Sequence, residues 1–109
     1  MSGMNKAAFA AKIGLKTETV TVPDFGDVTL RQWTVGQGKA VGKRIREDET
    51  NGAALIAIAS VIDSETGELM FELNDESLAF FQSLPIHVVK FIAEAANTLN
   101  GFTAPAKNP

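Results

Sequence analysis

The fold is decided by the stretch Thr17-Glu-Thr-Val-Thr-Val-Pro-Asp-Phe-Gly-Asp-Val-Thr-Leu-Arg-Gln-Trp33. Its first six residues form an alternating run of Thr and Val, and residues 27–33 are similarly rich in β-branched side chains. Residues 23–26, which lie between the two runs, have the Pro, Asp and Gly composition of a turn. These signals predict a β-hairpin.

Helical signals dominate the chain after the hairpin. Thr34 and Gln37 have the spacing of a capping box, which opens a helix. Residues 53–62 are apolar around the whole circumference of a helix, which is typical of a core position. Helices are expected over residues 35–47, over residues 53–62, after Asn74, and between Pro85 and Gly101. The sequence therefore predicts an α+β fold, an N-terminal hairpin followed by about four helices, mostly helical.

The chain of 109 residues has the size of one domain. Hydrophobic residues make up 45% and charged residues 21%, which is typical of a folded globular protein. We expect residues 1–16 to be a flexible segment or a short helix, residues 17–101 to form a single domain, and residues 102–109 to be a flexible tail.

Charge and cysteine content bear on location and partners. The formal net charge is -3, which argues against nucleic acid and against an anionic membrane as partners. The chain has no cysteine, and its apolar runs are too short for a signal peptide or a membrane span. We expect a cytoplasmic protein that is not secreted.

Candidate chemistry is sparse. The glycines between Gly36 and Gly42 do not have the spacing of a phosphate-binding loop. His87 is the only histidine, and it has neither a second histidine for a metal site nor a cysteine to activate. We therefore expect no catalytic residues, no metal site and no cofactor, and hence no enzyme.

The last helix carries an unusually broad apolar arc of roughly 220°, whereas one packing partner needs only about 100°. Two interpretations follow: the helix contacts the core on one side and another subunit on the other, or both contacts lie within the chain.

Basic residues gather on the preceding polar helix. Lys39, Lys43, Arg44 and Arg46 form a local patch on an otherwise acidic chain. The patch is either a solvated face or an electrostatic docking surface for an acidic partner or nucleic acid.

The order of these segments resembles the tail assembly chaperones of long-tailed phages. The likeness covers about residues 17–101 and includes a turn marked by Asp63, Gly67 and Phe71 and a closing helix that ends Leu99-Asn100-Gly101. The stretches that carry it are residues 20–31, Thr34, residues 58–71 and residues 84–101.

The resemblance implies a non-catalytic protein that binds the tape measure protein, helps to recruit tail tube subunits, and forms homo-oligomers. A helical tape measure protein with apolar stripes needs a partner with apolar grooves. We expect the partner or self-association surface to consist of Phe80, Phe81, Val88, Phe91 and Ala95.

One further expectation concerns the gene. Ala106-Lys107-Asn108 is compatible with a slippery codon heptamer, and family members are often made in a second, frameshifted form.

The alternative functions are a small nucleic-acid-binding regulator and a structural tail or head-completion subunit.

Overall fold

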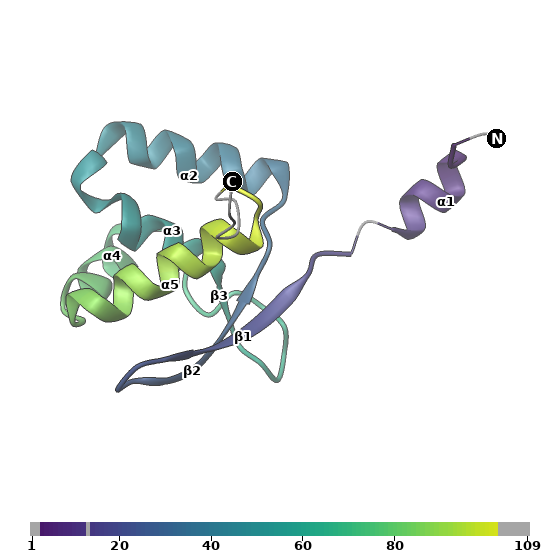
Figure 1. The fold of residues 1–109 in the computed structure, drawn as a ribbon. Helices are drawn as coiled ribbons and strands as arrows, with labels where there is room; N and C mark the ends of the chain where they lie inside the picture. Colours follow the sequence, from purple (N-terminus) through teal and green to yellow (C-terminus); the bar gives the residue numbers. More distant parts are fainter. Residues whose placement is uncertain (1–2, 13, 103–109) are drawn as a thin grey trace, which may run out of the picture.

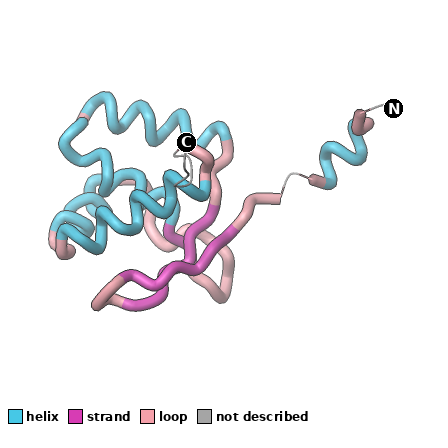
Figure 2. Tube along the Cα trace, viewed as in Figure 1, coloured by secondary structure: helices cyan, strands magenta, loops and turns pink. Residues whose placement is uncertain are grey.

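The computed structural model describes residues 3–12 and 14–102, whose arrangement is shown in Figure 1. The elements, in chain order, are α1 (Lys6–Ala11), β1 (Thr17–Val22), β2 (Gly26–Arg31), α2 (Val35–Glu47), the short 3-10 helix η1 (Glu49–Asn51), α3 (Gly52–Ser60), β3 (Val61–Ile62), α4 (Asp75–Gln82) and α5 (Ile86–Leu99). A hairpin is followed by four α-helices, which confirms the predicted α+β class (Figure 2). Of the predicted tail, only Phe102 lies within the described residues.

The predicted hairpin is a regular antiparallel pair in which Val20 lies opposite Val28. In its loop, Asp24 has a φ of 61° and Gly26 a φ of 139°. Asp tolerates the left-handed region better than most residues, and Gly enters it without steric cost, so this sequence allows the tight reversal. The core-facing residues of the two strands are even-numbered (Val20, Val22, Val28 and Leu30), whereas the odd-numbered ones are mostly threonines on the outer face.

The capping box predicted for α2 is confirmed. The Gln37 N–H donates to Thr34 Oγ1 at 3.1 Å, and the Thr34 N–H donates to Gln37 Oε1 at 3.2 Å. These bonds satisfy amides that have no partner within the helix. Gln37 Nε2 also donates to the carbonyl of Ala59 at 3.4 Å, which links α2 to α3.

The helix predicted over residues 53–62 is shorter than expected. It ends at Ser60, and β3 pairs antiparallel with Leu30 and Thr29 of β2. The prediction was wrong for the last two residues, because a run that is apolar on all sides fits a buried strand as well as a buried helix. The expected core position of α3 is confirmed, since most of its side chains are buried.

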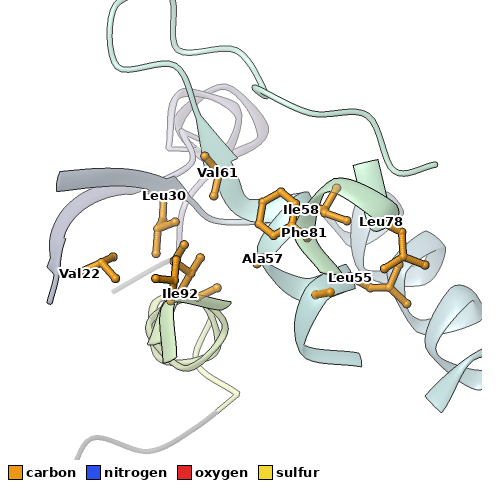
Figure 3. Close-up of a cluster of buried hydrophobic side chains, with 12 residues drawn as sticks. Val22, Leu30, Leu55, Ala57, Ile58, Val61, Leu78, Phe81 and Ile92 are labelled. Atoms are coloured by element: carbon orange, nitrogen blue, oxygen red, sulfur yellow. The ribbon is translucent and has the colours of Figure 1, made fainter. Parts of the chain in front are cut away.

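The core lies between the hairpin, α3 and α5. Val22 and Leu30 point from the sheet towards Ile92 of α5, and Ile58 and Phe81 extend the cluster towards α4 (Figure 3). Each fully buried side chain of this size contributes about 1.5–3 kcal/mol relative to an exposed one. This cluster fixes the position of α5 and, with it, the faces that remain open to solvent.

Candidate functional site

The partner surface predicted on α5 belongs largely to the core. Val88 and Phe81 are only 1% and 3% exposed, so the folded chain covers almost all of their surface. For Val88 the prediction of an outer, partner-binding position is wrong, whereas Phe81 lines an open groove beside Phe80. Phe91 and Ala95 are partly buried against the same core. Phe80, which is 50% exposed, is the member of the predicted set that reaches the surface.

The broad apolar arc of α5 is covered from two sides within the chain, by α3 and by the strands β1 and β2. Part of the arc stays open, since Ile86 at the start of α5 is 84% exposed. The end of α5 is also fastened to the end of β2. The Trp33 N–H donates to Asn100 Oδ1 at 2.7 Å, and Gln32 Nε2 donates to the carbonyl of Leu99 at 3.0 Å.

An open apolar groove of about 350 Å³ lies between the hairpin loop, β3, the segment that follows β3, and α4. Three large side chains in its lining are half exposed: Phe25 at 52%, Met70 at 51% and Phe80 at 50%. The groove is defined here by Phe25, Val28, Met70, Phe71, Phe80 and Leu84. Its volume is within the range that accommodates a small ligand or the anchoring side chains of a peptide.

Packed aromatic rings form one wall of the apolar groove. The ring centroid of Phe71 lies 5.6 Å from that of Phe80 and 5.0 Å from that of Phe81. Such pairs contribute about 0.5–1.5 kcal/mol beyond the burial of their area. Phe80 is therefore held in place although half of its surface is exposed, and little ordering of this wall is needed when a partner binds.

The apolar groove also runs along an unpaired edge of the sheet. In the strand order β1-β2-β3, β3 pairs with β2 only at Thr29 and Leu30. Asp27 and Val28 line the groove, and no strand of the described chain lies beside them on that side. Backbone N–H and C=O groups at such an edge can pair with an extended segment of a partner.

Most of the groove lining comes from an acidic interval of the sequence. Between Arg46 and Lys90 there is no Lys or Arg. The acidic residues in this interval are Glu47, Asp48, Glu49, Asp63, Glu65, Glu68, Glu72, Asp75 and Glu76. Asp27 adds a carboxylate to the lining itself. This charge distribution favours a partner segment that carries basic residues.

The basic patch predicted on α2 separates into two parts. Lys39, Lys43 and Arg46 are exposed, and their spacing of four and three residues places them on one face of the helix. Arg44 points away from that face, and its Nη2 lies 3.0 Å from Asp75 Oδ1 in an ion pair with α4. The surface that could meet an acidic partner therefore presents three cations.

The described residues contain no group of His, Cys, Asp and Glu side chains arranged to hold a metal ion. The Nε2 atom of His87 lies 2.9 Å from the carbonyl oxygen of Pro23, so this side chain links α5 to the hairpin loop. None of the helices within residues 3–12 and 14–102 combines the length and apolarity needed to cross a bilayer.

Of the three half-exposed residues of the apolar groove, the sequence prediction includes Phe80 and omits Phe25 and Met70. Phe25 lies in a turn, where a large apolar side chain has few neighbours to cover it, and this was an available signal. Met70 approaches Phe80 only because the chain returns along β3, with a bridge between Ile62 and Leu69. That return depends on contacts distant in sequence.

No protein-family model, curated protein or solved structure matches this chain.

Proposed function

We propose that this chain is a non-catalytic phage tail assembly chaperone that binds the tape measure protein and helps to recruit tail tube subunits in the host cytoplasm. The resemblance over about residues 17–101 supports the proposal. The observation that carries it is the apolar groove, where Phe25, Met70 and Phe80 are half exposed beside a rigid aromatic wall. An exposed apolar site of this kind on a soluble protein is typical of an interaction surface.

The mode of binding follows from the shape of the groove. An amphipathic helix of the tape measure protein lays its apolar stripe into the groove, with anchors at positions i, i+3, i+4 and i+7. Covering these stripes keeps the tape measure protein soluble, because uncovered stripes drive aggregation. A groove of about 350 Å³ holds only a few side chains, so several copies of the chain are needed along one long tape measure protein.

The test is co-expression with the tape measure protein of the phage genome that encodes the chain. The readouts are the amount of soluble tape measure protein and its co-purification with the tagged chain. Phe25→Asp and Met70→Lys should reduce both, because a charge in the groove must lose water without gaining a partner. Val35→Lys is the control, since Val35 is 82% exposed at the start of α2 and lies outside the groove.

Three outcomes would contradict the proposal. Equal recovery of tape measure protein with and without the groove substitutions would exclude the groove as its binding site. Steeply salt-dependent DNA binding that is lost in Lys39→Glu and Lys43→Glu would favour the nucleic-acid-binding regulator instead. Retention of the chain in purified, finished particles would favour the structural subunit.

A further inference from the structure

The N-terminal arm, defined as residues 3–12, carries apolar side chains that no other part of the described chain covers. Figure 1 shows α1 standing away from the rest of the molecule, and α1 has no buried residue. Phe9 is 62% exposed and Met4 58%. A helix of six residues is marginal in water without tertiary contacts, so the arm has the properties of a segment that docks on another surface.

The charges of the arm and of the apolar groove are complementary. The first seventeen residues of the chain include Lys6, Lys12 and Lys16 and no acidic residue. The segment from Asp63 to Glu76 flanks the groove and carries six acidic residues, of which Asp75 is paired with Arg44, while Arg31 donates to the carbonyl of Gly67. Opposite charges of this kind steer two surfaces together and disfavour the binding of an acidic segment.

The way the arm is joined to β1 favours binding of the arm to the groove of a second copy, not to the groove of its own chain. The arm joins β1 at Thr17, whereas the groove lies on the β3 side of β2, from Thr29 to Phe25 in the loop at the far end of the hairpin. The six residues of β1 span about 20 Å at roughly 3.4 Å per residue. The connection between α1 and Thr17 would have to turn back and run fully extended along β1, while a second copy imposes no such constraint.

We propose that the N-terminal arm of one copy binds in the apolar groove of a second copy. Phe9 enters the groove beside Phe25, Met70 and Phe80, and the lysines of the arm face the acidic segment. This inference does not rest on the proposed function, because it concerns only two copies of this chain.

The test is the mass of the full chain in solution, measured by sedimentation velocity over a range of concentrations. The unmodified chain should self-associate, and Phe9→Asp or Met70→Lys should weaken the association by at least about tenfold, as expected for the loss of an anchor at the centre of an interface. Val35→Lys, a matched substitution at an exposed apolar residue outside the groove, should leave it unchanged. Circular dichroism of each variant verifies that it is folded.

A mixture of the two defective variants gives the most specific result. Phe9→Asp retains an intact groove and Met70→Lys retains an intact arm, so an equimolar mixture should associate more strongly than either variant alone. Substitutions that merely damaged folding would not rescue each other in this way.

The proposal is overturned if the unmodified chain stays monomeric up to roughly 1 mM, a concentration that would reveal even weak association. It is also overturned if Phe9→Asp associates normally, or if the mixed variants stay monomeric. Failure here is distinguishable from failure of the proposed function. Phe9→Asp leaves the groove intact, so it should bind the tape measure protein as well as the unmodified chain does, or more tightly once the competing arm is lost.

Discussion

Helix α5 and the N-terminal arm both carry apolar side chains, but their surroundings differ completely. Val88 and Ile92 of α5 are buried between α3 and the hairpin, whereas Phe9 and Met4 of the arm lie open to solvent. The breadth of an apolar arc therefore does not reveal whether a helix serves the core or a partner. The elements that pack on a helix within the chain decide how much of the arc is buried, and α5 contacts α3 on one side and the hairpin on the other.

The first prediction concerns the covered helix. Val88→Asp places a carboxylate between α3 and the hairpin, where burial without a partner should destabilise the fold by more than about 4 kcal/mol. That loss is most of the stability of a typical small domain. Urea unfolding followed by circular dichroism measures it, with Val35→Asp as the exposed control. A stable Val88→Asp variant would show that α5 is not enclosed as described.

The second prediction concerns the junction that holds the end of α5 on the sheet. Asn100→Ala removes the acceptor of the Trp33 N–H and the donor to the carbonyl of Ala96. Leaving a partly buried amide unpaired should cost about 1–3 kcal/mol. The change is measured by urea unfolding monitored through Trp33 fluorescence. Thr98→Ala, on the exposed side of the same turn, should change stability little, and an equal loss in both variants would argue against the junction.

The third prediction concerns the other end of α5. His87→Ala removes the contact between Nε2 and the carbonyl of Pro23, which is exposed to solvent. Because water can replace the lost partner, the free energy of unfolding should fall by only about 0.5 kcal/mol. Lys90→Ala, one turn further along the polar face, serves as the reference. A loss as large as that of Asn100→Ala would mean that the hairpin loop depends on this bond.

The fourth prediction concerns the uncovered arm and has the smallest effect. Phe9→Asp should change the free energy of unfolding of the dilute chain by less than about 0.5 kcal/mol, because Phe9 is 62% exposed and the described chain buries little of it. Thermal or urea unfolding well below the concentration of self-association measures it. A loss above about 1 kcal/mol in the monomer would mean that the arm packs against its own chain, which would remove the contrast with α5.

Much of the fold was predictable because its signals are local. The hairpin loop, the capping box of Thr34 and Gln37, and the cap at Asn74 depend on groups a few residues apart, and all are observed. The end of α3 was predicted less well. Val61 and Ile62 join the sheet because β2 supplies their hydrogen-bond partners, and that choice is made some thirty residues away in the sequence.

The candidate site shows the same division between features set by local sequence and features set by contacts distant in the sequence. By itself, the sequence determined the local elements, the apolar content of α4 and α5, and the separation of basic and acidic segments. Only the tertiary structure decided that Val88 faces inward while Phe25, Met70 and Phe80 meet around one groove. The physical reason is that burial depends on which distant segments pack together, and periodicity along one helix carries no information about its neighbours.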